Sequence, residues 1–323
     1  MLRATLYEHE IRRAIGLAGE GSRLIDGIAP LGVAEDRCLY FINKSVPGAL
    51  RESLGARTGC IVITRSGSSL TDQLGDCLIL EVADPRLSIA RVLQFVKSEK
   101  RQQPWLSARH IASDAVVSPM SLVEGNVKIG SGVTIEAFCT IGPDVEIGAG
   151  SVVRAGARIY PRVSIGSHSI IGANTVIGSE GYGFVRDEDG RKTRIPHLGG
   201  VVIGSHVEIG ALSVVQYGTI SPTVIEDFVK IDDKVAIGHN SRVASSTSIT
   251  GGVIIGGSAT IESEVWIGMN STVRNGRTVG AQTLIGMDVS VQRDLPEKVV
   301  ARGRPPIVTT RTDDDLDVIG FKD

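Results

Sequence analysis

An aliphatic residue recurs every six positions over most of this sequence. Ile or Val occupies twelve consecutive six-residue steps in 111–177, three in 203–215 and twelve in 225–291. An α-helix repeats near 3.6 residues and an alternating strand every two, so neither has this period. A sustained period of six instead predicts a solenoid, in which three hexads make one 18-residue coil with short strands on three faces. The 27 hexads therefore predict nine stacked coils.

Two interruptions and the turn residues refine this prediction. The 26-residue step between Ile177 and Ile203 contains a Gly-rich segment, 178–202, which predicts a loop that projects outward. Four extra residues around Ser221-Pro222 precede the last block. Small or aliphatic residues fill the fifth place of the hexads, for example Val127, Val133, Cys139, Val145 and Ser151. These side chains predict a narrow aliphatic core that each coil specifies for itself.

The chain outside the repeat predicts two further units. Residues 1–103 do not repeat, and the apolar runs 60–63 and 77–80 have the composition of strands. Asp84-Pro85 supplies an N-cap and a first-turn proline for a helix that ends at a charged run, 97–101. We therefore expect a small α/β domain at 1–103, the solenoid at 104–300 and a short tail at 301–323.

Composition and simple motifs exclude several classes of function. The net charge is −2 and both signs are mixed along the chain, so we do not expect nucleic-acid binding. No signal-peptide core or membrane-spanning run is present, which predicts a cytoplasmic protein. The four cysteines have no paired spacing, and the histidines form no ligand pattern, so we expect neither disulfides nor a metal site.

The candidate chemistry lies at one corner of the last block. His239 occupies the third place of its hexad, and Gly257 occupies the same place one coil later. The exposed N–H of Gly257 could stabilise an oxyanion, which contributes roughly 10²–10³ in rate. Asp232 precedes His239 by seven residues and is expected to orient its imidazole. The alternative is a solvated turn histidine without a catalytic role.

Arg277 is the only charged residue at a fifth place among the 27 hexads. Burying a lone guanidinium is costly, so Arg277 is expected either to bind an anion or to turn out of the coil. It follows His239 by two coils and two residues, which places it on the order of 10 Å away.

The repeat, the segments 178–184 and 192–199 (KTRIPHLG), and Ile237-Gly238-His239-Asn240 resemble the UDP-3-O-acylglucosamine N-acyltransferases of lipid A biosynthesis. These enzymes are hexapeptide-repeat acyltransferases with a left-handed parallel β-helix. The run 27–43 is similar to the uridine-binding domain of the same family. The resemblance covers about residues 20 to 305.

The resemblance implies a homotrimer with active sites between neighbouring β-helices, and specific roles for several residues. His239 would be the general base that takes a proton from the sugar amine, Asp232 its orienting carboxylate and Gly257 the oxyanion donor. Tyr40 would stack on uracil and Asn43 would hydrogen-bond it. No cofactor would stay bound. The acyl donor would be a thioester of acyl carrier protein or coenzyme A, and the acceptor a UDP-linked amino sugar.

Four departures from the family pattern concern the substrate. Gln216-Tyr217 stands where the family has Asp-Arg, and Arg277 stands where it has a second histidine. Both are expected to contact substrate. Val46 replaces the second aromatic residue beside the uracil, and a tail with the acidic run 313–315 replaces a helical extension. An acidic tail would repel an acidic carrier protein.

Three functional hypotheses follow. The first is an N-acyltransferase that acts on a nucleotide-linked amino sugar. The second is an acetyl-CoA-dependent sugar acetyltransferase, and the third is a catalytically silent trimeric paralogue. Retention of His239, Asp232 and Gly257 argues against the third.

Overall fold

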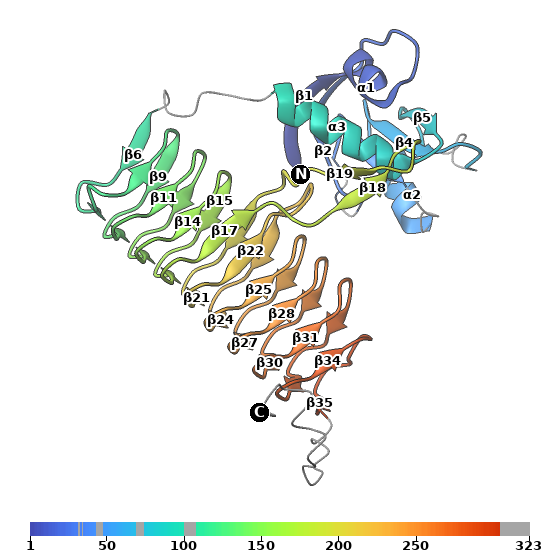
Figure 1. Cartoon of the computed structure of the whole chain (residues 1–323). Coiled ribbons are helices and arrows are strands. Elements are labelled where there is room, and N and C mark those ends of the chain that lie inside the picture. The colour runs from blue at the N-terminus through green and yellow to red at the C-terminus, as the bar shows by residue number, and fades with distance from the viewer. Residues whose placement is uncertain (32, 34, 43–47, 69–73, 100–107, 304–323) are drawn as a thin grey trace, which may run out of the picture.

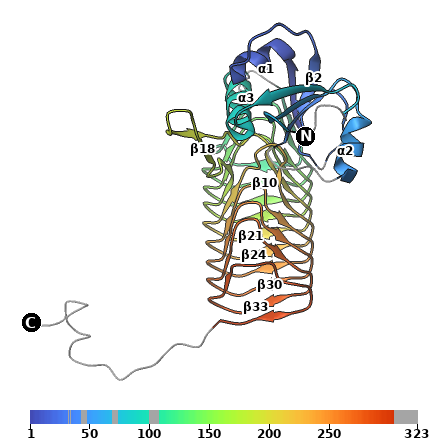
Figure 2. The ribbon, with the colours of Figure 1, turned by 90° about the vertical axis from the view of Figure 1, so that its right-hand side faces the viewer.

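The computed structural model describes residues 1–31, 33, 35–42, 48–68, 74–99 and 108–303. From residue 109 the chain winds into stacked coils, with a smaller α/β unit beside them (Figures 1 and 2). The strands of successive coils pair in parallel and form three faces. The mainly β, parallel β-helix that the period of six predicts is therefore confirmed.

The chain visits the three faces in turn, so we call them the first, second and third face. The first face contains β6 (Arg109–Ile111), β9 (Val127–Ile129), β12 (Glu146–Ile147), β15 (Val163–Ile165), β20 (Val201–Ile203), β23 (Thr223–Ile225), β26 (Arg242–Val243), β29 (Thr260–Ile261) and β32 (Thr278–Val279). The second face contains β7 (Val116–Val117), β10 (Thr134–Ile135), β13 (Val152–Val153), β16 (Ile170–Ile171), β21 (Glu208–Ile209), β24 (Lys230–Ile231), β27 (Ser248–Ile249), β30 (Trp266–Ile267), β33 (Leu284–Ile285) and β35 (Val300–Ala301). The third face contains β8 (Leu122–Val123), β11 (Thr140–Ile141), β14 (Arg158–Ile159), β17 (Val176–Ser179), β22 (Val214–Gln216), β25 (Ala236–Ile237), β28 (Ile254–Ile255), β31 (Thr272–Val273) and β34 (Ser290–Val291).

The grid residues form the core of the β-helix. All 27 are buried except Ile111, which is 40% exposed, and Val117, which is partly buried. Both belong to the first coil, and no earlier coil covers them. The expected aliphatic interior is therefore present from the second coil onward.

Hydroxyl groups at the fifth place connect successive coils inside this core. Ser151 Oγ donates to Gly166 O at 2.8 Å and accepts from the backbone N–H of Ser169 at 2.9 Å. Ser271 makes the same pair of bonds with Gly286 O and Val289 N. Because each hydroxyl satisfies a donor and an acceptor of the next coil, these polar side chains are buried without an unpaired group.

The fourth place of the hexad adopts a left-handed backbone conformation at most corners. Asp144, Asn240 and Ser258, for example, have φ of 58°, 58° and 59°. Asn and Asp tolerate this conformation better than most other residues that carry a side chain. Larger side chains also occupy this place, for example Phe138, Leu212 and Lys234, so the repeat imposes the conformation whatever the residue.

The N-terminal unit has a five-stranded sheet and three helices. The sheet order is β1 (Leu2–Tyr7), β2 (Leu24–Ile28), β3 (Cys38–Ile42), β4 (Ile61–Arg65) and β5 (Leu78–Val82), and the helices are α1 (Glu8–Ile15), α2 (Gly48–Gly55) and α3 (Pro85–Glu99). The strands expected at 60–63 and 77–80 and the helix after Asp84 are confirmed. Asp84 Oδ1 caps α3 by accepting from Arg86 N at 2.8 Å.

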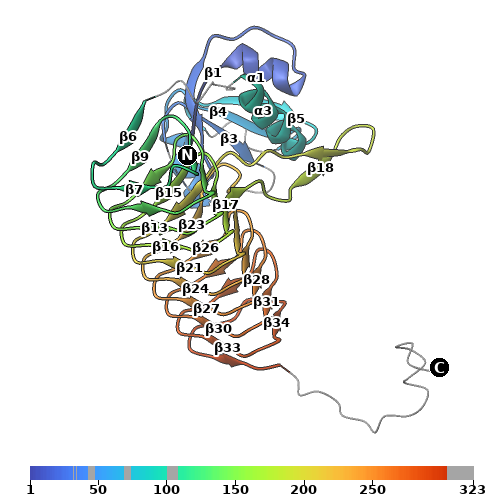
Figure 3. The same cartoon turned by 60° about the vertical axis from the view of Figure 1, so that its left-hand side comes forward.

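The insertion 178–202 forms a β-hairpin that the sequence did not predict. Its strands β18 (Phe184–Arg186) and β19 (Lys192–Arg194) pair antiparallel and contact α3 (Figures 1 and 3). Arg91 of α3 forms an ion pair with Glu188 at 2.7 Å, and Lys97 forms one with Glu180 at 3.1 Å. The hairpin projects outward as expected, but α3 supports it.

The second half of the insertion returns to the protein. Ile195 and Leu198 are buried in the same hydrophobic cluster as the core of the N-terminal unit. Apolar burial therefore joins this unit to the β-helix. The expected domain boundary near residue 103 and the acidic run 313–315 both lie outside the described residues. Within the described residues, no helix has the length and apolar content needed to cross a membrane.

Replacing a grid residue should destabilise the β-helix according to its burial. Ile147→Ala removes a side chain that is 3% exposed and should cost about 2–5 kcal/mol of unfolding free energy. Ile111→Ala is the matched control, because Ile111 lies on the same face but is 40% exposed, and it should cost under about 1 kcal/mol. Urea unfolding followed by circular dichroism measures both values. If both variants lost the same unfolding free energy, the grid residues would not form a core according to their burial.

Candidate active site

His239 lies at the corner where the chain passes from the third face to the first, between β25 and β26. We call this the third corner. β25 pairs with β22 on one side and with β28 on the other, so Gln216 and Gly257 belong to the neighbouring coils. The backbone N–H of His239 donates to Gln216 Oε1 at 3.2 Å. Gln216 therefore supports His239 from the preceding coil.

Gly257 makes room for the imidazole of His239. A Cβ atom at Gly257 would lie 2.6 Å from His239 Nε2, so this position cannot carry a side chain while the ring stays in place. A Cβ at Gly238 would likewise lie 2.5 Å from Gly257 N. No described residue accepts a hydrogen bond from the Gly257 N–H. The sequence prediction that Gly257 and His239 are direct neighbours at one corner agrees with this geometry.

The imidazole of His239 is half-buried, and burial lowers its pKa. Its Nδ1 lies 2.9 Å from Nδ2 of Asn240. Asn240 is held in turn by Thr219, whose backbone N–H donates to Asn240 Oδ1 at 2.6 Å. The side-chain amide of Asn240, at the same corner, is therefore the group that contacts Nδ1 of His239.

His197 is a second histidine in the site, and sequence reasoning missed it. It comes from the insertion, is 3% exposed, and its ring centroid lies 4.8 Å from that of His239. A Cβ at Gly181 would lie 2.7 Å from both His197 Nε2 and His239 Cβ, so a glycine is needed there. Burial, and then the neighbouring His239, lower the pKa of His197 to about 4.

One of the two ring nitrogens of His197 has no partner in the described structure. Its Nδ1 is buried and makes no hydrogen bond. The insertion leaves the β-helix after Ile177, at the same corner as His239 and two coils earlier. Counting coils from the interruption would have placed the insertion beside His239, although not His197 itself.

Comparison with known proteins places the chain in a family. Residues 126–161 and 144–179 match the family described as bacterial transferase hexapeptide (six repeats). A UDP-3-O-acylglucosamine N-acyltransferase of Delftia acidovorans is 40% identical over 245 residues, which cover 76% of this chain and 69% of that protein. This chain belongs to the UDP-3-O-acylglucosamine N-acyltransferase family. A second member, from Cupriavidus pinatubonensis, is 36% identical over 271 residues, which cover 80% of this chain and 74% of that protein.

A solved structure bears on the fold of this family member. The UDP-N-acetylglucosamine acyltransferase from Campylobacter jejuni superposes with a TM-score of 0.52 at 21% identity. The match covers 63% of this chain and 81% of that protein. At this identity the likeness concerns the β-helix alone, and it agrees with the observed architecture.

Asp232 does not lie where the sequence analysis expected it. It follows β24 at the corner between the second and third faces, whereas His239 lies at the third corner. Its carboxylate accepts from the backbone N–H of Asp233 at 2.8 Å and lies beside Gly251. Within one chain Asp232 therefore does not orient His239, because the two side chains belong to different corners.

Two tyrosines expected to bind substrate are buried. Tyr40 in β3 is 0% exposed, and its hydroxyl accepts from the backbone N–H of Glu35 at 2.8 Å. Tyr217 is 5% exposed, and its hydroxyl donates to Pro161 O. Both predictions are wrong for the described structure, because neither ring has a face free for a ligand. Asn43 and Val46 lie outside the described residues.

Arg277 turns towards the edge of the coil, which is one of the two arrangements that the sequence left open. The side chain is 36% exposed, and its Nη1 lies 3.5 Å from Asp294 Oδ1. Its Nε is buried and makes no hydrogen bond within the described structure. The guanidinium therefore lies at the edge of the third corner, where it is partly exposed and paired with Asp294.

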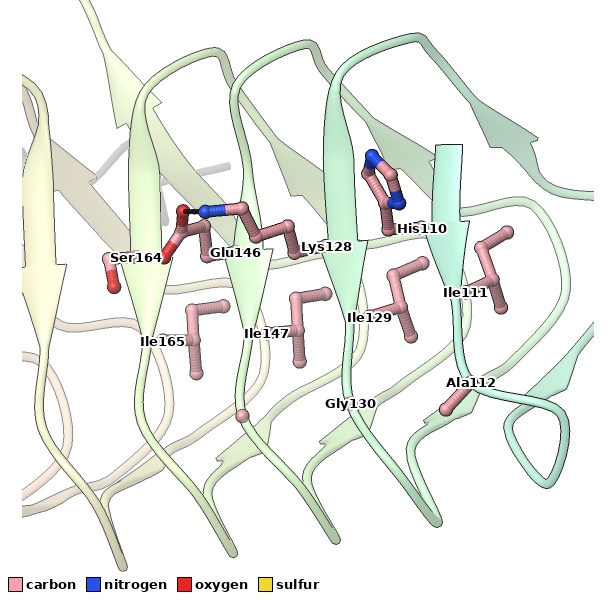
Figure 4. Close-up of a pocket in the computed structure, with 11 residues that line it drawn as sticks. His110, Ile111, Ala112, Lys128, Ile129, Gly130, Glu146, Ile147, Ser164 and Ile165 are labelled. Carbon is pink, nitrogen blue, oxygen red and sulfur yellow. Dashed lines mark hydrogen bonds and ion pairs between the residues drawn. The ribbon is translucent and has the colours of Figure 1, made fainter. Parts of the chain in front are cut away.

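A separate groove of about 560 Å³ lies on the first face and contains none of the predicted site residues. Figure 4 shows its lining as a ladder in which His110, Lys128 and Glu146 occupy equivalent places in successive coils. Lys128 and Glu146 form an ion pair. In the part of the chain that the structure describes, no group of three or more metal-ligating side chains comes together.

The buried His197 should make stability sensitive to acid. Its pKa of about 4 lies below the ordinary 6.5, so only the unfolded chain binds this proton between these values. The stability that depends on the neutral ring is complete above pH 6.5 and is lost as the pH falls towards 4. His197→Gln should reduce that loss by roughly 1–3 kcal/mol.

Urea unfolding at both ends of this pH window measures the effect. His110→Gln is the control, because it makes the same substitution at an exposed histidine outside the candidate site. An unchanged slope for the His197 variant would contradict a neutral, buried imidazole.

Proposed function

We propose that this protein transfers an acyl group from a thioester donor to the amine of a nucleotide-linked amino sugar. The observation that supports this activity is the contact between the imidazole of His239 and Gly257, whose N–H finds no acceptor among the described residues. Amine attack on a thioester needs a group that takes a proton and a donor for the developing oxyanion. The third corner holds both.

The reaction proceeds by direct transfer in this proposal. The amine nitrogen attacks the thioester carbonyl carbon, and the carbonyl oxygen gains negative charge beside the Gly257 N–H. His239 takes a proton from the amine and returns it to the sulfur when the carbon–sulfur bond breaks. The products are an amide and a free thiol. Lowering of the His239 pKa by burial favours the neutral imidazole that this base role requires.

A homotrimer would complete the site. Asp232 lies at a corner that His239 does not share, so it can approach the imidazole only from a neighbouring copy. We propose that the active sites lie between copies and that Asp232 of one copy faces His239 of the next. The half-exposure of Arg277 at the same corner leaves it available to a ligand in that cleft.

The family relationship supports a more specific acceptor and pathway. Its named members act on UDP-3-O-acylglucosamine, so we propose a UDP-linked amino sugar as acceptor and a role in lipid A biosynthesis in the cytoplasm. The donor would be acyl carrier protein or coenzyme A. Mass spectrometry of products from both donor types with a panel of UDP-amino sugars tests this assignment. Robust turnover with acetyl-CoA and none with long-chain acyl carrier protein would instead favour a sugar acetyltransferase.

Removing the proposed base should lower the rate of amine acylation. His239→Ala should lower kcat/KM for amine acylation at least tenfold, because positioned proton transfer contributes about 10²–10⁴ in rate. Steady-state kinetics with purified protein measures the loss. His110→Ala is the matched control, since His110 lies on the same β-helix, outside the site, and should retain full activity. A loss of less than threefold for His239→Ala would contradict the base role.

Arg277 should bias the enzyme towards an anionic group of the substrate. A guanidinium binds phosphate or carboxylate through charge-assisted hydrogen bonds worth about 1.5–3 kcal/mol. Arg277→His should therefore reduce the preference for a carboxylated over a neutral acyl or sugar group about tenfold. The ratio of kcat/KM values for the two substrates measures this change. Arg274→His, at an exposed position of the same corner, is the control, and equal ratios in both variants would exclude the role.

A further inference from the structure

We propose that Asn240 is a positioning residue that selects which nitrogen of His239 carries hydrogen, and that it holds the resting imidazole in the form protonated on Nε2. The side-chain amide of Asn240 is placed between Thr219 and His239 by three hydrogen-bond contacts. The assignment of atoms in these contacts follows from which groups can only donate. It applies to the neutral imidazole, in which one ring nitrogen donates and the other accepts.

Thr219 fixes the orientation of the Asn240 amide. The backbone N–H of Thr219 can only donate, so the Asn240 atom 2.6 Å from it is the oxygen Oδ1. Nδ2 is then the atom that donates to Thr219 Oγ1 at 3.0 Å. The backbone N–H of Asn240 also donates to the buried Thr223 Oγ1 at 2.9 Å. Rotating the amide by 180° would place its NH₂ group against the Thr219 N–H and leave two donors facing each other.

The second hydrogen of Asn240 Nδ2 faces His239. The distance from Nδ2 to His239 Nδ1 is 2.9 Å, so Nδ1 is the acceptor in this contact. The neutral ring must then carry its hydrogen on Nε2. Nε2 is the nitrogen beside Gly257, where the oxyanion donor of the proposed site lies. The atom of His239 that faces this part of the site is therefore an N–H group at rest.

Within a single copy of the chain, no other group around the imidazole is placed to accept a hydrogen bond from Nδ1–H. On the insertion side the nearest titratable group is His197, and the charged groups acting on it are Glu180 and Arg194. On the side of the β-helix the neighbours are Gln216, Gly257 and Asn240, none of which titrates. Within the described chain, the Nδ1 contact is made by Asn240 alone.

This inference rests on the proposed function for its kinetic consequence. A base that takes the amine proton on Nε2 needs a lone pair there, which the form protonated on Nδ1 provides. The contact with Asn240 disfavours that form, because Nδ1–H would face the NH₂ group. The resting enzyme would then have to exchange the hydrogen between the two nitrogens, or turn the amide, before it accepts a proton.

Asn240→Asp reverses this preference with little change in shape. A carboxylate can still accept from the Thr219 N–H, and its second oxygen would accept from His239 Nδ1–H instead of donating to it. The fold tolerates Asp in this backbone conformation, since Asp144 has φ 58° at the equivalent place of the third corner. Asn240→Ser is the matched control, because Ser258 occupies the same place one coil later with φ 59°. Serine removes the amide without adding an acceptor charge.

Nitrogen-15 solid-state spectra of histidine-labelled protein report the hydrogen position directly, and the signals that His239→Gln removes identify His239 among the six histidines. For the wild type at a pH where His239 is neutral, we expect a non-protonated Nδ1 and a protonated Nε2. For Asn240→Asp we expect the reverse. A wild-type spectrum with hydrogen on Nδ1 would overturn the proposal whatever the activity of the protein.

Kinetics provides the second readout, which a merely structural role would not change. A carboxylate beside the imidazole raises its pKa, so the acidic limb of the kcat/KM profile should move to higher pH in Asn240→Asp but not in Asn240→Ser. An unshifted limb with an unchanged spectrum would overturn the proposal. A reversed spectrum with lost activity would support it and instead refute the base role of His239.

Discussion

Hydrogen bonding between coils eighteen residues apart is the constraint on which the rest of this structure depends. Each strand of the β-helix pairs in register with the strand one coil away, as Ile129 pairs with Ile147 and Ile147 with Ile165. The two interruptions lie at the third corner, between β17 and β20 and between β22 and β23, so the strands on either side of them keep this register. The buried hydroxyls at the fifth place reinforce the same register, because Ser151 satisfies groups of the next coil. The six-residue period of the sequence therefore follows from the pairing of strands one coil apart.

Register also explains why part of the candidate active site could be predicted from the sequence. His239 and Gly257 occupy the same place of the hexad one coil apart, so counting alone puts them side by side. The same count placed Arg277 at the corner of His239. It could not give the direction of the guanidinium, which depends on the local partner Asp294. Positions along the axis of a solenoid are thus predictable, and side-chain directions at its corners are not.

Groups that reach the site from outside the repeat were not predictable. His197 lies in an insertion without any period, and its contact with His239 depends on how Ile195 and Leu198 pack against the N-terminal unit. Asp232 is close to His239 in sequence but belongs to another corner, because consecutive hexads lie on different faces. The resemblance that assigned Tyr40 to a ligand did not account for its burial within β3 and its hydrogen bonds to Val33 and Glu35. In each case tertiary contacts, which have no signature in spacing, decided the outcome.

The insertion contacts both α3 and the corner that holds His239. Lys97 of α3 contacts Glu180, and the next residue, Gly181, lies against the ring of His197 and the Cβ of His239. One wall of the corner that holds His239 is consequently anchored to the α/β unit instead of to the coil that carries the histidine. A small rotation of that unit would be transmitted through one residue to the imidazole pair. The position of α3 and the shape of the corner that holds His239 are thus coupled through the adjacent residues Glu180 and Gly181.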